Sequence, residues 1–348
     1  MRTARLIEEG RSFYHVVSRV VDRRMVFEAK DKEVFRNIMR NLEAFMGVRV
    51  VTYCLMSNHF HLLLEVPDRD ELPELTEEEL LAVLPRLHDG SAVLTVKQEL
   101  ERARKSGDER WHREILDRYE YRRGSLSFFL KELKQRVTLY MNKRLGRTGT
   151  LWEGRFKSVL VEGNQNALLT IAAYIDLNPV RAGIVNRPEE YRWCGYAESL
   201  SGTRNAKLAR EGLGVALAES LADGDFKASW PRTRSRYRQF LFEEGEEREE
   251  NAELGQRSRR GFSQEKIEAV TEKRGEMTVP EVLRDRVRYF CDGVVLGSAE
   301  FVDDVFARGK EKGLYGEKRT TGARKMRGAE WGSLRVLRDL QVNVIGSG

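Results

Sequence analysis

The clearest hydrophobic pattern lies in residues 12–66, where apolar runs alternate with one amphipathic segment. Residues 12–20 and 48–66 are rich in β-branched and aromatic side chains, which favour strands. Between them, apolar residues from 31 to 46 recur at spacings of three and four, which predicts a helix. The pair Ser57-Asn58 divides the second run and suits a tight turn. The pattern therefore predicts β-α-β-β, the first part of a ferredoxin-like layout.

Beyond residue 66 the pattern changes several times. Residues 67–120 read as helical, highly charged and low in aromatics, and we interpret them as a helical insertion on the surface. Residues 165–177 read as an apolar helix that ends at Asn178-Pro179, because a residue before proline avoids the helical region. Residues 201–255 show few apolar positions at any clear period and are interpreted as a linker. Residues 256–348 are interpreted as a small basic C-terminal domain and a candidate for DNA binding.

These elements predict an α+β fold. We expect a ferredoxin-like antiparallel sheet with helices on one or both faces, followed by a mainly helical C-terminal extension. A chain of 348 residues can bury a sizeable core and hold two domains. Residues 1–200 form the first expected unit, with residues 67–120 inserted into it.

Composition narrows the class of protein. Charged residues make up 33% and apolar residues 41%, which is typical of a soluble protein, and no apolar run approaches the roughly 20 residues of a membrane helix. The first residues lack the apolar core of a signal peptide. Three separated cysteines, Cys54, Cys194 and Cys291, indicate neither a disulfide framework nor a structural zinc site. We therefore expect a cytoplasmic protein without a membrane partner.

Positive charge is concentrated in residues 121–160. This stretch carries ten Lys or Arg and two acidic residues, a net charge of +8 against +6 for the whole chain. Lys and Arg neutralise phosphates and aromatic rings stack on bases, so we expect nucleic acid as the partner. An ordinary basic amphipathic helix with aromatics in the core is the alternative, and for the aromatics other than Trp152 it is the favoured one. The candidate nucleic-acid contacts, here and near the end of the first strand, are Arg19, Arg23, Arg24, Arg136, Arg144, Arg147, Trp152, Arg155 and Lys157.

Two of the five histidines, His59 and His61, lie one residue apart in an apolar run. On a strand, residues i and i+2 share a face, so both imidazoles project the same way with Phe60 behind them. Neutral imidazoles bind divalent metal ions. The alternative is a pair of structural histidines within the sheet, and the pair alone does not decide between the two. For His15, on the first predicted strand, packing within the sheet is the favoured interpretation.

Tyr174 and Asn178 lie at the end of the predicted helix 165–177, four residues apart, and can share a face. A tyrosine hydroxyl is a usable nucleophile at phosphorus when the phosphate is polarised and held in line. A divalent ion on two imidazoles and one amide or carboxylate oxygen leaves open positions for a phosphate and stabilises the leaving 3′ oxygen. Attack by Tyr174 would give a 5′-phosphotyrosine and a free 3′-hydroxyl. One tyrosine handles one strand, which suits single-stranded DNA.

Three motifs together resemble the HUH single-tyrosine transposases, and in particular the REP-associated tyrosine transposases. The resemblance covers about residues 10–200. The motifs are Tyr14-His15-Val16-Val17-Ser18-Arg19 through Met56-Ser57-Asn58-His59-Phe60-His61, then Gly146-Arg147-Thr148-Gly149-Thr150-Leu151-Trp152-Glu153-Gly154-Arg155-Phe156-Lys157, and Tyr174-Ile175-Asp176-Leu177-Asn178-Pro179-Val180-Arg181.

The resemblance implies a ferredoxin-like catalytic domain and a transposase that cuts hairpin-bearing single-stranded DNA. It implies Mg²⁺ or Mn²⁺ on His59 and His61, with Asn178 completing the metal site, and it places the nucleophile on Tyr174. A helix-capping role for Asn178 is the alternative.

Two other functions stay open from the sequence: a hairpin-binding regulator that does not cleave, and a replication-initiation or relaxase-type HUH nuclease. Neither a monomer nor a homodimer is excluded.

Overall fold

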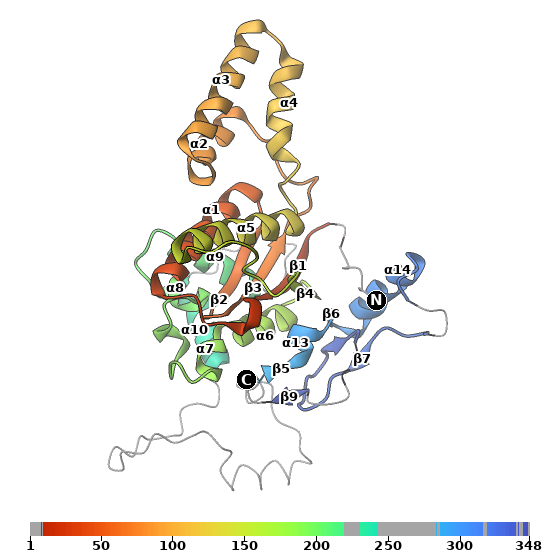
Figure 1. The fold of residues 1–348 in the computed structure, drawn as a ribbon. Coiled ribbons are helices and arrows are strands. Elements are labelled where there is room, and N and C mark those ends of the chain that lie inside the picture. The colour runs from red at the N-terminus through yellow and green to blue at the C-terminus, as the bar shows by residue number, and fades with distance from the viewer. Residues whose placement is uncertain are drawn as a thin grey trace, which may run out of the picture.

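Figure 1 shows the fold of the protein in a computed structural model. The structure describes Glu8 and residues 10–218, 230–242, 283, 286–315, 319–338, 340 and 344–346. Parts of the expected linker and all of residues 243–282 therefore lie outside the described residues. Within the described residues, no helix combines the length and apolarity needed to span a bilayer.

A seven-stranded sheet organises the molecule. Its order is β2-β3-β1-β4-β6-β8-β7. The first four strands are β1 (Ser12–Arg19), β2 (Arg49–Leu55), β3 (His59–Val66) and β4 (Lys157–Val161). Neighbours among these four are antiparallel, so they form the order 4-1-3-2 of a ferredoxin-like unit. The predicted α+β class and the ferredoxin-like sheet are confirmed, and the hairpin turn falls at Ser57-Asn58 as expected.

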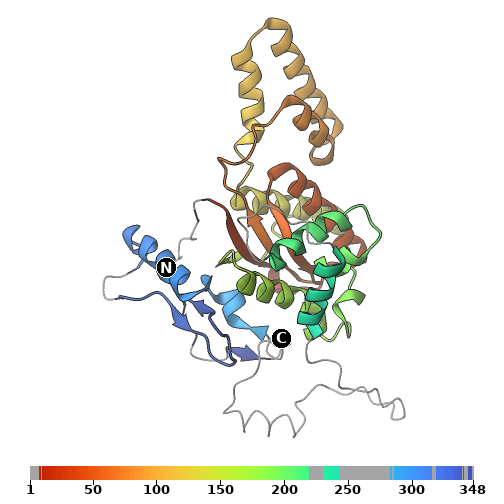
Figure 2. The same ribbon diagram turned by 180° about the vertical axis from the view of Figure 1, so that it is seen from behind.

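The two faces of this sheet carry different helices. On one face, α1 (Ala29–Met46) and α5 (Leu126–Leu145) pack on each other and on the sheet. On the other face, α6 (Gln165–Asp176) and α9 (Ala206–Leu217) contact β2. Figure 2, which is turned by 180° from Figure 1, shows the molecule from this side. Phe60, Leu62 and Leu64 of β3 belong to the first core, whereas Leu63 belongs to the second. Because side chains alternate along the strand, β3 contributes residues to two separate hydrophobic cores.

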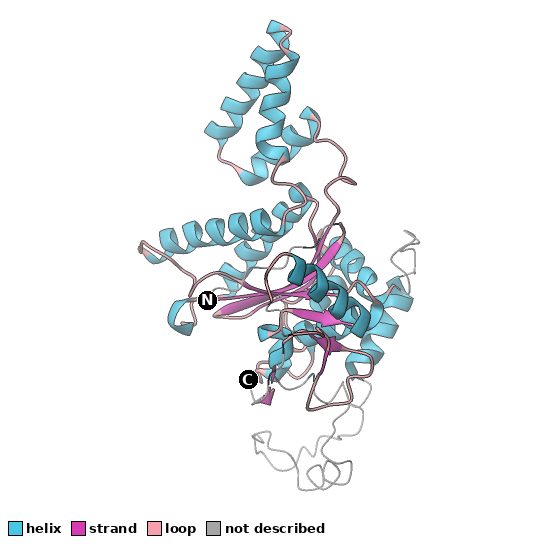
Figure 3. Cartoon of the chain, turned by 90° about the vertical axis from the view of Figure 1, so that its right-hand side faces the viewer, coloured by secondary structure: helices cyan, strands magenta, loops and turns pink. Residues whose placement is uncertain are grey.

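The inserted segment forms an arm of three helices. They are α2 (Glu77–Leu87), α3 (Gly90–Ser106) and α4 (Glu109–Glu120). Figure 3 shows the arm projecting away from the sheet. Each helix begins at a residue whose side chain caps a backbone N–H, namely Thr76, Asp89 and Asp108. The helical insertion predicted for residues 67–120 matches this arm.

Five further helices are described up to residue 242. These are the 3₁₀ helices η1 (Val21–Arg23) and η2 (Pro188–Glu190), and α7 (Asn178–Arg181), α8 (Gly195–Leu200) and α10 (Trp230–Phe242). The helices α9 and α10 fall in the range interpreted as a linker. In the structure α9 packs on β2 and α6, and α10 packs on α9, so these residues are part of the core layer. Helix α9 shows no clear apolar period in the sequence, because small residues face the sheet. At Gly212 only glycine fits, since a Cβ there would meet the carbonyl oxygen of Val50 at 2.4 Å.

The C-terminal residues continue the same sheet instead of forming a detached unit. Strand β6 (Val295–Gly297) pairs in parallel with β4, and β8 (Arg335–Val336) and β7 (Arg324–Lys325) follow. The helices here are α13 (Arg288–Asp292) and α14 (Ala299–Glu311). A separate two-stranded ribbon joins β5 (Arg286–Val287) and β9 (Ile345–Gly346). This arrangement differs from the separate domain that we expected at 256–348.

Candidate functional site

Three histidines gather on the α6 face of the sheet. His59 and His61 project from β3 on this face, with Phe60 in the opposite core, as the alternation predicted. His15 comes from the neighbouring strand β1, and its Nε2 lies 2.9 Å from Nδ1 of His61. His15 lies two residues before Val17, and Val17 pairs with His61 in the sheet register. The sequence favoured sheet packing for His15, and only the strand register brings it to His61.

Burial keeps these imidazoles neutral. Desolvation lowers the pKa of His15 to about 4 and that of His59 to about 3, with a further lowering of the latter by the nearby guanidinium of Arg19. It lowers the pKa of His61 well below 6.5, and the other two histidines add to this effect. The Arg181 guanidinium acts in the same direction on all three rings. At neutral pH each ring therefore keeps a nitrogen lone pair, the form that binds metal ions.

Tyr174 lies against the histidines. Its ring centroid is 6.1 Å from that of His61 and 6.1 Å from that of His15, both in edge-on geometry. The guanidinium of Arg181, one short helix later, sits over the phenol ring at 3.9 Å from its centroid. Helix α6 and the following turn thus bring the predicted nucleophile and a cation to the histidine face. Burial raises the pKa of Tyr174, and Arg181 opposes that shift.

Helix α13 of the C-terminal segment covers this tyrosine. The Tyr174 hydroxyl lies 3.5 Å from Sγ of Cys291, and the Phe290 ring packs edge-on at 4.9 Å. The carbonyl oxygen of Phe290 lies 2.8 Å from Nδ1 of His15. As a result only 2% of Tyr174 is exposed. The sequence pattern favours a helix within residues 280–293, which include α13, but it does not indicate that this helix packs against Tyr174.

Asn178 is buried at the start of α7, and its side-chain Nδ2 has no hydrogen-bond partner among the residues that the structure describes. The hydrogen bonds of His59 and His61 in the described part of the chain go to Asn58 and His15, not to Asn178. The backbone carbonyl of Asn178 accepts from the N–H of Ala182, which closes the single turn of α7. The unpaired atom is a donor nitrogen and not the oxygen that would bind a metal ion, so the metal-binding role of Asn178 stays a prediction.

The donor set bears on which ion fits. Within the described part of the chain no group of three His, Cys, Asp or Glu side chains is arranged to hold a metal ion. Two neutral imidazoles can supply two ligands to a divalent cation, and oxygen donors would have to supply the others. Mg²⁺ and Mn²⁺ favour oxygen ligands and keep open positions for water or phosphate. His59 and His61 therefore fit as a partial site that an amide oxygen and substrate oxygens would complete.

Several predicted nucleic-acid contacts have structural partners. Arg144 pairs with Asp31 at 2.7 Å, and Arg136 donates to the carbonyl oxygen of Leu87. Trp152 is buried, with its Nε1–H donated to the carbonyl oxygen of Lys134 and to the Thr138 hydroxyl. The rings of Phe60 and Phe27 pack against it. Arg144, Arg136 and Trp152 therefore each have a structural role on the α1–α5 face that does not require bound nucleic acid.

Other predicted contacts remain at the surface. Arg23, Arg24 and Arg155 are exposed, and Arg19 pairs with His59 in the strand register. Lys157 forms an ion pair with Asp292 at 2.7 Å, and Arg147 donates to the carbonyl oxygen of Thr150. Arg19, Arg23 and Arg24 lie at or just past the end of β1 that pairs with the histidine end of β3, so they lie beside this site. Lys157 pairs with Val17, the residue that pairs with His61 on the other side of β1.

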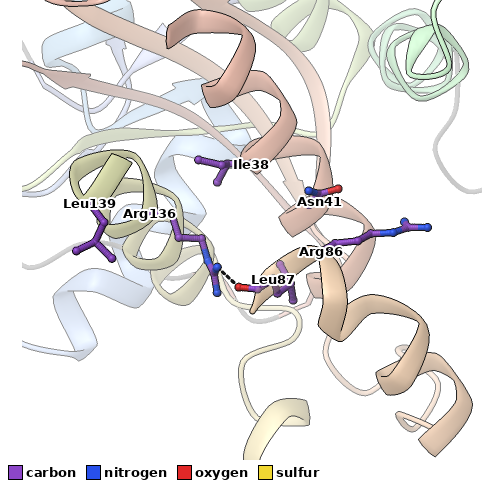
Figure 4. A pocket seen from close by; sticks show the side chains of 6 residues that line it. All are labelled: Ile38, Asn41, Arg86, Leu87, Arg136 and Leu139. Atoms are coloured by element: carbon purple, nitrogen blue, oxygen red, sulfur yellow. Dashed lines mark hydrogen bonds between the residues drawn. The ribbon is translucent and has the colours of Figure 1, made fainter. Parts of the chain in front are cut away.

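A separate pocket of about 270 Å³ lies where the arm meets the body (Figure 4). It is lined by Ile38, Asn41, Arg86, Leu87, Arg136 and Leu139. These residues come from α1, α2 and α5, on the face opposite the histidines. The pocket therefore does not belong to the histidine site.

Comparisons with known proteins bear on the histidine half of this site. Residues 10–78 match the family model "Transposase IS200 like". A solved structure described as "Structure of the REP associates tyrosine transposase bound to a REP hairpin" is 12% identical over 57% of this chain and 86% of that chain, with a TM-score of 0.36. Comparison with curated proteins found no match. The matched segment contains β1, α1, β2 and β3, so it includes His15, His59 and His61 but ends before Tyr174. This family match confirms a resemblance to IS200-like transposases over residues 10–78, the segment that contains the three histidines.

Proposed function

We propose that this protein is a transposase-type nuclease and strand transferase that acts on hairpin-bearing single-stranded DNA through Tyr174. One observation carries the proposal: the Tyr174 ring lies 6.1 Å from the ring of His61, although the two residues are 113 positions apart in the chain. A phenol beside neutral imidazoles is the combination that a metal-assisted attack on phosphorus needs. The family match of residues 10–78 supports the same class of enzyme.

The proposed step forms one bond to phosphorus and breaks another. The Tyr174 oxygen loses its proton and forms a bond to phosphorus, while the bond from phosphorus to the 3′ oxygen breaks. The leaving oxygen takes up a proton, which gives a 5′-phosphotyrosine and a free 3′-hydroxyl. Attack by another 3′-hydroxyl reverses the step and joins strands without a further energy source, because the phosphotyrosine keeps the energy of the phosphodiester.

His59 and His61 would hold a divalent ion, Mg²⁺ or Mn²⁺, with Asn178 as the candidate third ligand. When bound, such an ion supplies Lewis-acid stabilisation of charge on the phosphate oxygens. The chain's own residues supply the rest. Arg181, positioned 3.9 Å from the phenol ring centroid, favours the ionised form of Tyr174 and offsets part of the effect of burial.

The exposed arginines near the end of β1 are the candidates for gripping the DNA backbone. Arg23 and Arg24 are exposed, and Arg19 pairs with His59 across the strands. Arginine binds phosphate through charge and paired N–H donors. A strand that follows these side chains would pass beside the histidines, which is the geometry that cleavage next to a bound hairpin requires.

A hairpin-binding protein that does not cleave is the second candidate function. The burial of Tyr174 under α13 favours it, because a nucleophile with 2% exposure cannot reach a phosphate in this form. Under the first candidate α13 must move away from Tyr174 when DNA binds, whereas under the second it stays in place. Cleavage therefore separates the two functions.

The test uses labelled single-stranded hairpins, Mn²⁺ and a denaturing gel that detects protein–DNA adducts. The wild-type protein should form an adduct, and Tyr174→Phe should form none while binding the hairpins with similar affinity. Tyr140→Phe is the matched control, because Tyr140 on α5 donates to Asp31 on the other face of the sheet. A full adduct with Tyr174→Phe would reject the nucleophile, and binding without any wild-type adduct would favour the second function.

A further inference from the structure

We infer that His15 and Asn58 are positioning residues that fix the imidazoles of His61 and His59 with both Nε2 lone pairs free for a ligand. His15 accepts a hydrogen bond from Nδ1–H of His61, and Asn58 accepts one from Nδ1–H of His59. His15 and Asn58 each donate in turn to a backbone carbonyl, which gives two short chains of hydrogen bonds. The inference rests on the proposed function only for what the two lone pairs bind. Both chains can be followed atom by atom in the structure.

The first chain begins at Phe290. Its carbonyl oxygen can only accept, so Nδ1 of His15, 2.8 Å away, carries a proton. A neutral imidazole has a single N–H, which leaves Nε2 of His15 as an acceptor. Nδ1 of His61 lies 2.9 Å from that nitrogen and must donate to it. The remaining nitrogen of His61, Nε2, then carries the lone pair.

The second chain begins at Arg23. The side-chain Nδ2 of Asn58 donates to the Arg23 carbonyl oxygen at 2.9 Å, which fixes the orientation of the amide. Oδ1 of Asn58 therefore faces His59, whose Nδ1 lies 2.6 Å away and must donate. His59 is left with its lone pair on Nε2, as His61 is. Two different side chains thus produce the same tautomer in the two candidate ligands.

The backbone at the end of the second chain is strained. Asp22 and Arg23 have φ angles of 56° and 54°, and among the described residues they are the non-glycine positions with positive φ. The left-handed region is unfavourable for an L-residue, because it brings Cβ too close to the following carbonyl oxygen. Strain of this kind persists where the surroundings enforce it, and it is concentrated at functional sites. Here it presents the Arg23 carbonyl to Asn58.

The two chains end in different parts of the protein. Arg23 lies within residues 10–78, the segment that matches the transposase family model, whereas Phe290 lies in α13 of the C-terminal segment. The orientation of His61 therefore depends on a residue more than 200 positions away, and that of His59 does not. Ligand-binding histidines commonly give their second N–H to such a partner, and loss of the partner typically weakens metal affinity by 10–100-fold.

The first test observes the tautomers directly in the metal-free protein. Long-range ¹H–¹⁵N correlation of the imidazoles should show both His59 and His61 protonated on Nδ1. In His15→Leu, which removes both bonds, His61 should lose this preference while His59 keeps it. In Asn58→Ala the reverse is expected. A wild-type His61 protonated on Nε2 would overturn the inference.

The second test measures Mn²⁺ affinity by calorimetry on the chelator-treated full chain. His15→Leu should weaken binding by about 10–100-fold, and His15→Gln should restore part of it, because its amide oxygen can accept from His61. Val17→Ala is the matched control: Val17 lies on the same strand and in the same core, pairs with His61 in register, and offers no side-chain nitrogen. Each variant is compared by circular dichroism, so that a fold defect is recognised.

These readouts are independent of DNA cleavage. Wild-type affinity in His15→Leu, or an equal loss in Val17→Ala, would overturn the positioning role even if cleavage occurs. A loss in His15→Leu with rescue by His15→Gln would support it even if Tyr174 forms no DNA adduct. Failure of the inference and failure of the proposed function therefore give different results.

Discussion

The two faces of the central sheet differ in what they bury. On the face under α1 and α5 the side chains of β3 are apolar, and Phe60 packs there against Phe35 and Trp152 at centroid distances of 5.2 and 5.4 Å. The face under α6 and α13 carries His61 and Tyr174. A single strand, β3, supplies both faces by alternation. The comparison shows that adjacent residues of β3 face an apolar core on one side and the candidate site on the other.

The separation has an energetic basis. Apolar side chains on the α1–α5 face stabilise the fold by roughly 25 cal/mol per Å² of buried surface. The buried carboxylates of α1, Asp31 and Glu43, are paired with arginines. On the other face the Nδ1 atoms of the buried histidines need partners, because an unpaired buried polar group is costly. The histidines meet this demand through His15 and Asn58, which constrains the site.

The largest predicted effect is on the apolar face. Phe60→Ala should lower the free energy of unfolding by about 3–5 kcal/mol, because it empties a fully buried position between Phe35 and Trp152. Urea denaturation measures this loss. Leu139→Ala, at a side chain with 63% exposure, is the control and should change stability by less than about 0.5 kcal/mol. A loss below about 1 kcal/mol for Phe60→Ala would contradict the division between the faces.

An effect of intermediate size is predicted at Asp176, on the polar face. Burial raises its pKa to about 6, although hydrogen bonds from Tyr237, Tyr196 and Thr52 oppose the shift. The native state then binds this proton up to about pH 6, whereas the unfolded chain releases it near pH 3.8. The carboxyl group therefore lowers stability as pH rises from about 4 to 6, by on the order of 3 kcal/mol.

Asp176→Asn removes this titration. The stability of the variant minus that of the wild type should therefore increase as pH rises from about 4 to 7, whatever its value at the acidic end. Thermal or urea unfolding of both proteins across this range measures the difference, in which all other titrating groups cancel. A difference that does not change with pH would show that Asp176 is ionised throughout.

The smallest effect is predicted at the edge of the polar face. Lys157 forms an ion pair with Asp292 of α13, and the lysine side chain is 67% exposed. Surface pairs of this kind contribute about 0–1 kcal/mol, so Lys157→Ala should hardly change global unfolding. Hydrogen exchange of α13 amides is the sensitive readout, and a modest loss of protection confined to α13 is expected. A global loss above about 2 kcal/mol would mean that α13 supports the whole sheet.

Much of the first unit was predictable because its patterns are local. The alternation in β3 placed His59 and His61 on one face with Phe60 behind, and the helical spacing of residues 31–46 predicted α1, which the structure gives as Ala29–Met46. The apolar helix before Asn178-Pro179 was predicted to within one residue of its end. Each of these signals depends on neighbours a few positions apart in the chain.

The remaining features depend on distant contacts. The basic segment appeared as a phosphate-binding surface, but Arg144 is paired with Asp31, more than 100 residues earlier. Helix α9 shows no clear apolar period because small residues such as Ala209 and Gly212 face the sheet. Strand β6 has three residues and lies beside β4 only through tertiary pairing. Sequence patterns carry no information on such partners.

The parallel pairing of β6 with β4 has a practical consequence for work with shortened forms of this protein. The backbone N–H of Leu160 donates to Val294, and that of Glu162 donates to Leu296. Truncating the chain after residue 200 would remove these acceptors and leave β4 as an uncovered border able to recruit a second molecule. A dimer observed with such a fragment would then be a product of the truncation rather than the native assembly.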